Sequence, residues 1–234
     1  MNEPISTGCT AIDSLLGGGL ERGVVTQLYG PPAAGKTNLA LSASVQVAAS
    51  GGKTLYIDTE GISVDRFEAL AEAAADDENV ETIAGRVIVS DALDFDEQRE
   101  AVRDAGELAE SVDLIVLDSA TGFYRLERDD DDDGETLRAV AKQVTQLLAF
   151  ARRHDLAVLI TNQVYSDPDA DSSRARPLGG HTLTHWSGVV LRLERFRGGN
   201  RRVTLEKHGS KAAGETERFR ITDDGLEGVD ESAP

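Results

Sequence analysis

The amino-acid sequence predicts an α/β fold in which a mainly parallel sheet is flanked by helices and ends in an antiparallel β meander. Short apolar runs alternate with segments of helical length, a glycine-rich loop joins the first run to the first helix, and the C-terminal part changes to an alternating pattern. Strands that alternate with such helices form a parallel sheet covered on both faces. No segment of the 234 residues reads as a linker, so we expect residues 1–234 to form one domain.

Five apolar runs are predicted to be the parallel strands: residues 24–29, 53–58, 86–89, 114–118 and 156–161. Helices are predicted between them, at residues 37–50, 63–75, 94–110 and 135–154. Apolar runs without polar alternation are typical of strands buried on both faces. Because the second strand comes early in the sheet, we expect it to lie next to the first.

The pattern after Gly188 is that of antiparallel strands. Alternating residues predict strands at residues 189–196, 201–207 and 217–221, with turns at residues 198–200 and 223–225. Both turns contain the Gly, Asn or Asp residues that tight turns require. We therefore expect a meander of three strands at the C-terminal end of the fold.

A phosphate-binding P-loop is the most informative motif. It consists of Gly30, Pro31, Pro32, Ala33, Ala34, Gly35, Lys36 and Thr37, between a predicted strand and a predicted helix. In this setting, backbone N–H groups and the positive end of the helix dipole surround the phosphates of ATP or GTP. We expect Lys36 to contact the β- and γ-phosphates, the Thr37 hydroxyl to bind Mg²⁺, and the adjacent Asn38 to contact the nucleotide. The alternative is a glycine-rich turn that matches by chance.

Acidic residues follow two of the predicted strands. Four apolar residues and then Asp118 have the form of a Walker B strand, whose carboxylate holds Mg²⁺ beside Thr37. Glu60 follows the second strand, where a carboxylate can orient and deprotonate the water that attacks the γ-phosphate. The alternatives are a helix-capping role for Asp118 and a solvated Glu60.

An amide and a long polar segment follow the fifth strand. Gln163 stands at the end of that strand, where its amide can hydrogen-bond the γ-phosphate and reorder the following loop on hydrolysis. Residues 164–183 form this loop, which is too long for an ordinary connection. Its basic residues are Arg174 and Arg176, together with His181. We expect a mobile, functional loop.

Several stretches resemble the RecA/RadA recombinase family, and in particular its short archaeal paralogues. They are ISTGCTAIDSLLGGGLERGVVTQLYGPPAAGKT, LYIDTEG, LIVLDSATGFYR, LAVLITNQV and RPLGGHTLTHW. The resemblance extends over about residues 5–228 and implies a RecA-like P-loop ATPase core that binds ATP and Mg²⁺. It also implies a role in homologous recombination and DNA repair, as an accessory to a main recombinase of the RadA type.

The resemblance assigns roles to individual residues. Glu60 matches the family's catalytic glutamate and Gln163 its γ-phosphate-sensing glutamine, and with Lys36 they form the expected catalytic group. Arg66 resembles the residue that packs on adenine, although the spacing after Glu60 is one residue shorter. Lys207 stands where KaiC-like relatives place a basic residue that acts across a subunit interface. ATP would then lie between adjacent subunits, so the resemblance implies self-association.

DNA contacts are implied for the loops after Asp118 and after Gln163, with Arg174 and Arg176 as the expected cations. The first loop departs from the family, because five consecutive Asp occupy residues 129–133. This run is either a solvated loop or a surface that repels DNA phosphates. The chain begins almost at the core, so we expect no N-terminal DNA-binding domain and only weak binding of single-stranded DNA.

The composition is strongly acidic. There are 42 acidic residues against 24 basic ones, five of them Lys, and the net charge is −18. Such surfaces suit proteins of salt-rich cells, because at 1 M salt the Debye length is only about 3 Å. No apolar run approaches a membrane span and no signal peptide is present, so we expect a cytoplasmic protein without membrane contact. Cys9 is the single cysteine, which excludes an internal disulfide and favours a buried thiol.

Three functions compete at this stage. The first is an ATP-binding, weakly or conditionally hydrolysing accessory of recombination that also binds single-stranded DNA. The second is a nucleotide-dependent scaffold for partner proteins, in which ATP is a conformational ligand and DNA has no part. The acidic run at 129–133 favours the scaffold, whereas Arg174 and Arg176 favour the accessory. A small-molecule kinase fits poorly, because the sequence has no Arg-rich lid segment.

Overall fold

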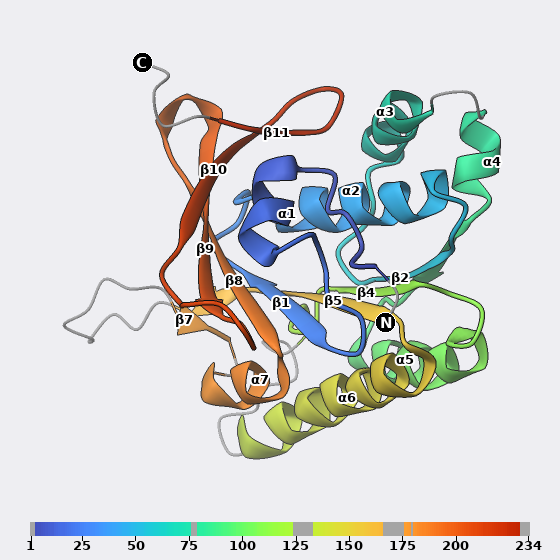
Figure 1. Ribbon diagram of the computed structural model, residues 1–234. Helices are drawn as coiled ribbons and strands as arrows, with labels where there is room; N and C mark the ends of the chain where they lie inside the picture. The colour runs from blue at the N-terminus through green and yellow to red at the C-terminus, as the bar shows by residue number, and fades with distance from the viewer. Residues whose placement is uncertain (1–2, 76–78, 124–132, 166–175, 179, 230–234) are drawn as a thin grey trace.

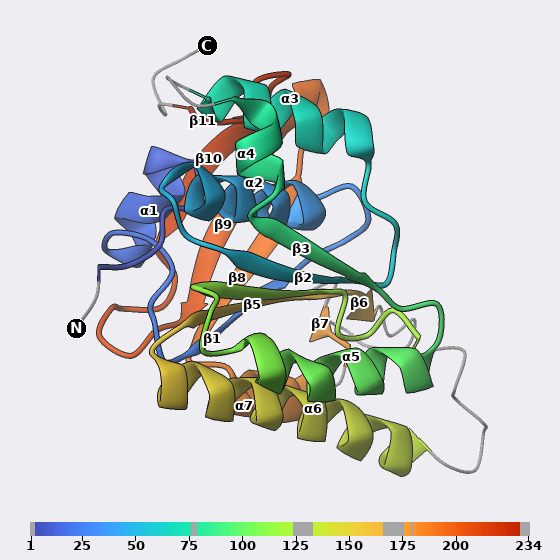
Figure 2. The same ribbon diagram turned by 90° about the vertical axis from the view of Figure 1, so that its right-hand side faces the viewer.

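In the part of the chain that the structure describes, a nine-stranded sheet lies between two layers of helices (Figures 1 and 2). The structure, a computed structural model, describes residues 3–75, 79–123, 133–165, 176–178 and 180–229. The strands of the large sheet are β1 (Val25–Tyr29), β2 (Thr54–Asp58), β3 (Val87–Asp91), β4 (Leu114–Asp118), β5 (Ala157–Asn162), β8 (Val189–Arg195), β9 (Asn200–Lys207), β10 (Thr216–Ile221) and β11 (Leu226–Gly228). Their order is β11-β10-β9-β8-β1-β5-β4-β2-β3.

The sheet has a parallel and an antiparallel half, as the sequence predicted. Strands β8, β1, β5, β4, β2 and β3 run parallel to one another, and β9, β10 and β11 continue from β8 as antiparallel neighbours. The expectation that the second strand lies next to the first is wrong. β5 and β4 stand between β1 and β2, so the P-loop strand pairs with β5 and β8, which come from the second half of the chain.

Helices cover both faces of the sheet. They are α1 (Thr10–Leu16), α2 (Lys36–Ala49), α3 (Val64–Ala74), α4 (Val80–Ala84), α5 (Phe95–Leu108), α6 (Asp133–His154) and α7 (Gly180–Trp186). Figure 2 shows α1 to α4 on one face and α5 to α7 on the other. The side chains of Ser63, Asn79 and Asp94 accept N–H groups at the starts of α3, α4 and α5, as N-caps do.

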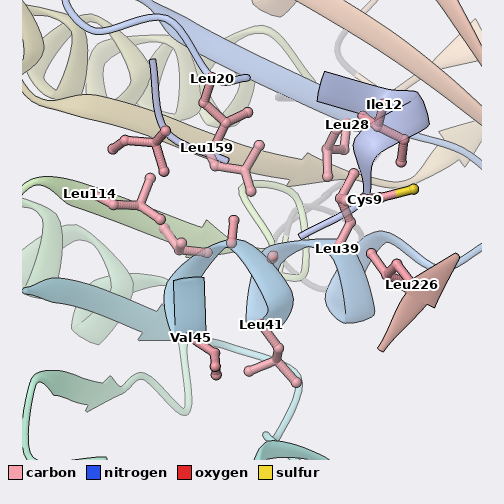
Figure 3. Packing of buried hydrophobic residues seen from close by; sticks show 14 of the residues in the cluster. Cys9, Ile12, Leu20, Leu28, Leu39, Leu41, Val45, Leu114, Leu159 and Leu226 are labelled. Atoms are coloured by element: carbon pink, nitrogen blue, oxygen red, sulfur yellow. The ribbon is translucent and has the colours of Figure 1, made fainter. Parts of the chain in front are cut away.

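The two faces of the sheet bury separate apolar clusters. Along β4, Leu114 and Val116 face the cluster under α1 to α4, whereas Ile115 and Leu117 face the cluster under α5 to α7. Figure 3 shows part of the first cluster, where Leu114 of the sheet lies near α2. A strand that packs on both faces needs apolar residues at every position, which explains its unbroken apolar run. None of the helices in the described part is long and apolar enough to cross a membrane.

Several short elements were not predicted. α1, α4, α7 and β11 are each seven residues or shorter, and an additional hairpin pairs β6 (Val164–Tyr165) with β7 (Arg176–Pro177). The predicted loop at 164–183 therefore contains two strands and the start of a helix in its described parts. Helices of this length depend on tertiary packing more than on their own sequence pattern. In α1, for example, the Thr7 N–H and hydroxyl bind Asp13 Oδ1 at 2.8 and 2.6 Å.

Candidate nucleotide-binding site

The P-loop leaves β1 at Tyr29 and enters α2 at Lys36. A Cβ on Gly30 would lie 2.3 Å from the Leu193 carbonyl oxygen, so only glycine fits beside β8 at that point. Gly35 has φ 104° and precedes the first helical residue, a conformation that L side chains rarely adopt. These glycines let the chain turn tightly enough to direct the N-terminus of α2 at a ligand.

A cavity of about 220 Å³ opens at this N-terminus. It is lined by Pro32, Ala33, Gly35, Lys36, Thr37, Asn38, Glu60 and Gln163. The structure therefore brings the P-loop together with the predicted general base and the predicted γ-phosphate sensor. Helix N–H groups, an ammonium, a hydroxyl and an amide in one cavity are the groups that bind a polyphosphate.

The Lys36 ammonium is held over its own loop. Its Nζ donates to the Gly30 carbonyl at 3.0 Å and to the Pro31 carbonyl at 3.3 Å, and the residue is 9% exposed. Burial lowers the pKa of Lys36, while the charges of Glu60 and Asp118 act in the opposite direction. Carbonyl oxygens are weak partners for a buried ammonium, so phosphate oxygens can replace them at this position.

An Asx turn positions Glu60. The Asp58 carboxylate accepts the N–H groups of Glu60, Gly61 and Ile62 at 3.0, 2.9 and 2.6 Å. This turn carries the Glu60 side chain to the cavity, where Gln163 Nε2 donates to its Oε1 at 3.0 Å. β2 does not need to neighbour β1 for Glu60 to reach the P-loop, because the turn spans the remaining distance.

Asp118 lies in a buried hydrogen-bond network. It is 1% exposed and accepts from the Tyr56 hydroxyl at 2.7 Å and from the Thr161 hydroxyl. Burial raises the pKa of Asp118, and the side chains of Thr161, Tyr56 and Thr37 oppose that shift. The pKa of Tyr56 lies well above its ordinary value, because burial and the neighbouring Asp118 charge disfavour the phenolate. The effect of Thr37 shows that the predicted Walker B carboxylate lies close to the P-loop.

These oxygen donors fit Mg²⁺. Mg²⁺ in nucleotide sites takes one or two protein oxygens and completes its shell with phosphates and water. The Thr37 hydroxyl and the Asp118 carboxylate would hold it, and the Thr37 side chain lies close enough to Asp118 to lower the pKa of that carboxyl. In the described part of the chain, no group of three or more His, Cys, Asp or Glu residues is arranged to bind a metal ion.

Arg66 joins three parts of the fold at the edge of the site. Its Nε donates to Asn38 Oδ1 at 2.8 Å, and its Nη1 donates to the Thr222 and Asp223 carbonyls at 2.7 Å each. Burial lowers the pKa of Arg66. Arg66 is not among the residues that line the cavity, and its contact with adenine stays a prediction.

Lys207 ends β9 and caps α7. Its Nζ donates to the carbonyls of Thr184, His185 and Ser187 at 2.8, 3.3 and 2.7 Å. Cations are favourable at helix C-termini because they bind the free carbonyls there. Lys207 thus has a full set of acceptors within its own chain, and its action across a subunit interface stays a prediction.

The predicted DNA contacts fall largely outside the described residues. Arg174 and residues 129–132 lie in undescribed segments, and Asp133 is the first residue of α6. Arg176 belongs to β7, where its backbone pairs with Tyr165. The roles of Arg174 and Arg176 in DNA binding therefore remain predictions.

Residues that support the site were missed by the sequence analysis. The Gln163 N–H donates to the Thr121 hydroxyl at 3.2 Å, and that hydroxyl donates to Asn162 Oδ1 at 2.8 Å. Tyr56 and Thr161, which hold Asp118, lie within apolar strands. A polar residue inside a fully buried strand is the signal that identifies such supporting groups.

The fold and the cavity define a RecA-type P-loop nucleotide-binding core. The family model named Rad51 matches residues 3–229, so the chain belongs to the Rad51 family. It is 62% identical to the DNA repair and recombination protein RadB of Halobacterium salinarum, over 95% of this chain and 94% of the relative. It is 41% identical to the protein of the same name from Methanococcoides burtonii, over 97% and 98% of the two chains.

A solved structure agrees with these relatives. The crystal structure of the RadB recombinase superposes with a TM-score of 0.80 and 37% identity, covering 97% of this chain and 100% of that one. The inferred resemblance to short archaeal recombinase paralogues is confirmed. A relative from Halobacterium also agrees with the acidic composition.

Proposed function

We propose that this Rad51-family protein is an ATP- and Mg²⁺-dependent accessory of homologous recombination and DNA repair that assists the main recombinase of its cell. The observation that carries the proposal is the Gln163–Glu60 hydrogen bond in the P-loop cavity, beside Lys36 and Thr37. A general base held by a neutral amide at the phosphate end of a P-loop is suited to conditional hydrolysis.

The residues of the cavity have different roles in nucleotide binding and hydrolysis. The α2 N–H groups and Lys36 bind the phosphates, and Thr37 with Asp118 orients Mg²⁺, which neutralises phosphate charge when bound. Glu60 takes the proton of the attacking water. While the Gln163 amide donates to the Glu60 carboxylate, Glu60 is not free to accept the proton of the water. A γ-phosphate that accepts the Gln163 N–H in its place leaves the Glu60 carboxylate free for that step.

Gln163 also begins the segment proposed to contact DNA. Its carbonyl accepts the Leu178 N–H at 2.8 Å, and Asn162 Nδ2 donates to the Leu178 carbonyl at 2.8 Å. These bonds fix both ends of the segment that contains Arg174 and Arg176. A change in the Gln163 partner on ATP binding can therefore alter how that segment is presented to single-stranded DNA.

The proposal is tested by the effect of single-stranded DNA on ATP turnover in molar KCl. We expect slow basal turnover that rises when DNA is added, and no turnover in Lys36→Ala. The same assay with the main recombinase present tests assistance directly. Turnover that is identical with and without DNA, at every salt concentration, would contradict a DNA role.

The net charge of −18 favours a second candidate, a nucleotide-dependent scaffold for partner proteins. Long-range repulsion of DNA phosphates by such a charge is strong at low salt and screened at high salt. For this candidate, ATP changes the affinity for a protein partner or for a second copy of the chain, and DNA changes nothing. Sedimentation of the protein with and without ATP tests the self-association that an ATP site between subunits requires.

A further inference from the structure

One arginine of the meander packs directly against the P-loop. Arg201 lies on β9 opposite Arg195 of β8 and Phe219 of β10, so its side chain is on the face that carries α1 and α2. Its Cδ and Nε are both 3.3 Å from the point where a Cβ on Gly35 would stand. Gly35 also lines the nucleotide cavity, so Arg201 flanks the start of α2 from the meander side.

The Arg201 guanidinium is largely unpaired. Its Nη1 donates to the Gly199 carbonyl at 2.7 Å, but its Nε is buried and has no hydrogen-bond partner among the described residues. No carboxylate of the described part forms an ion pair with it. By contrast, Arg192 of β8 pairs with Glu206, and Arg202 of β9 pairs with Glu194, at 2.9 and 2.8 Å.

The surroundings of Arg201 disfavour its charge. Burial lowers the pKa of Arg201, and the neighbouring Arg195 charge lowers it further. A partly buried cation with an unsatisfied donor, facing a second cation, destabilises the ligand-free protein. Among the described residues, Arg192 and Arg202 have carboxylate partners and Arg201 does not, so the N–H donors of Arg201 can bind the anion of a ligand.

We propose that Arg201 binds a phosphate oxygen of the nucleoside di- or triphosphate held at Gly35. The inference rests on the proposed nucleotide binding and adds to it a binding residue from the antiparallel half of the fold. A guanidinium offers five N–H donors in a planar fork that matches phosphate geometry, and Arg201 uses one of them on Gly199. Rotation of the Arg201 side chain would move its remaining N–H donors from Gly35 toward the phosphate.

The location of Arg201 predicts which ligands depend on it. Lys36, Glu60 and Gln163 serve the terminal phosphate, whereas Arg201 approaches the loop at Gly35, beside Ile221. ADP and ATP should therefore depend on Arg201 alike, and adenosine should not. A nucleotide phosphate at this point would also fix the start of β9 against the P-loop, which makes the meander sensitive to nucleotide occupancy.

The test compares wild type, Arg201→Ala, Lys36→Ala and Arg218→Ala in molar KCl, by calorimetric titration with adenosine, ADP and ATP and by thermal unfolding. Arg218 is an exposed arginine of β10 and serves as the matched control. We expect about tenfold or greater loss of ADP and ATP affinity in Arg201→Ala, the loss of a charge-assisted hydrogen bond. Without nucleotide, its Tm should equal or exceed that of wild type, because an unsatisfied buried donor has been removed. Arg218→Ala should match wild type throughout.

Each outcome decides a separate question. Undiminished ADP and ATP affinity in Arg201→Ala, while wild type binds and Lys36→Ala does not, would overturn this inference alone. A lower nucleotide-free Tm with equal losses for adenosine and ADP would show that Arg201 is only structural, and would also overturn it. Failure of wild type to bind ATP would overturn the proposed function itself.

Discussion

The Gln163 side-chain amide donates a 3.0 Å hydrogen bond to Glu60 Oε1, although the strands that precede the two residues are not neighbours. β4 lies between β2 and β5, and its last residue, Asp118, is buried behind the pair. The bond therefore bridges two strand ends over the Walker B carboxylate. It links the predicted general base to the predicted γ-phosphate sensor, so that a ligand that binds one side chain also affects the other.

Glu60→Gln should keep nucleotide affinity and lower ATP turnover by about 10²–10⁴-fold. The amide still fills the space and still bonds Gln163, but it cannot accept the proton of the attacking water. Turnover is measured by phosphate release under conditions where wild type clearly hydrolyses ATP. Glu68→Gln, an exposed position of α3, is the control. Equal turnover in Glu60→Gln and wild type would show that Glu60 is not the general base but a solvated acid at a strand end.

Lys36→Ala should abolish productive binding of ATP with Mg²⁺ and leave the fold intact. The Lys36 ammonium bonds only loop carbonyls in the described structure, so its removal leaves no buried carboxylate unpaired. Calorimetric titration measures the affinity, and circular dichroism the fold. Lys53→Ala removes an exposed lysine that directly precedes β2, and this variant should bind ATP as wild type does. Undiminished affinity in Lys36→Ala would refute the P-loop assignment.

Asp118→Asn should both impair Mg²⁺-dependent nucleotide binding and lower the free energy of unfolding by about 1–3 kcal/mol. The sequence predicts a Walker B residue that holds Mg²⁺. The structure shows that its two oxygens accept from the hydroxyls of Tyr56 and Thr161, and the NH₂ of the substituted amide would face one of these donors instead of accepting from it. Denaturant unfolding of this variant and of Asp65→Asn, an exposed control, measures the difference. Equal stability would mean that the network rearranges at no cost.

Arg174→Ala combined with Arg176→Ala should weaken single-stranded DNA binding and leave ATP affinity unchanged. Both arginines belong to the segment whose ends are fixed near Gln163 and Leu178. The loss should be larger at 0.1 M than at 1 M salt, because the Debye length falls from about 10 Å to about 3 Å. Fluorescence anisotropy across a KCl series measures it. Identical DNA affinity for the double variant and wild type at all salts would exclude this segment as the DNA site.

Cys9 should react with thiol reagents only when the protein unfolds. It is 0% exposed, and burial is the largest cause of its raised pKa, so less thiolate is present at a given pH than in an exposed cysteine. Figure 3 shows it among the buried residues near Ile12. Maleimide labelling in increasing denaturant should follow the unfolding transition. Rapid complete labelling of the native protein would show that α1 opens independently.

The parallel strands and the P-loop were predictable because their signals are local. An unbroken apolar run that ends in a polar residue, as at Asp118, specifies a buried strand and the side chain at its end. Strand order is not local: nothing in residues 24–29 indicates that β5 and β8 are the neighbours of β1. The wrong expectation that β2 lies next to β1 followed from the order of the strands in the sequence. In a sheet with helices on both faces, neighbouring strands need not be consecutive in the sequence.

The sequence identified Glu60 and Gln163 as candidate site residues, but it did not predict the contact between them. Glu60 and Gln163 each follow a strand, yet their hydrogen bond depends on the Asp58 turn and on the position of β4. Arg201 could not be linked to Gly35 from the sequence, because their proximity arises from the antiparallel half of the sheet. The contact of Arg66 with adenine stays a prediction, and its bonds to the turn after β10 could not be predicted from the sequence.

The position of β1 in the sheet also sets the order in which the molecule can assemble. β2, β3 and β4 can pair with one another as soon as they leave the ribosome, but β1 pairs with β5 and β8, which are made much later. Contacts between distant parts of a chain form slowly, and unpaired strands expose apolar surface in the meantime. The P-loop is thus the first motif of the chain to be translated and among the last to gain its neighbours, so ATP can stabilise only a molecule that is already nearly complete.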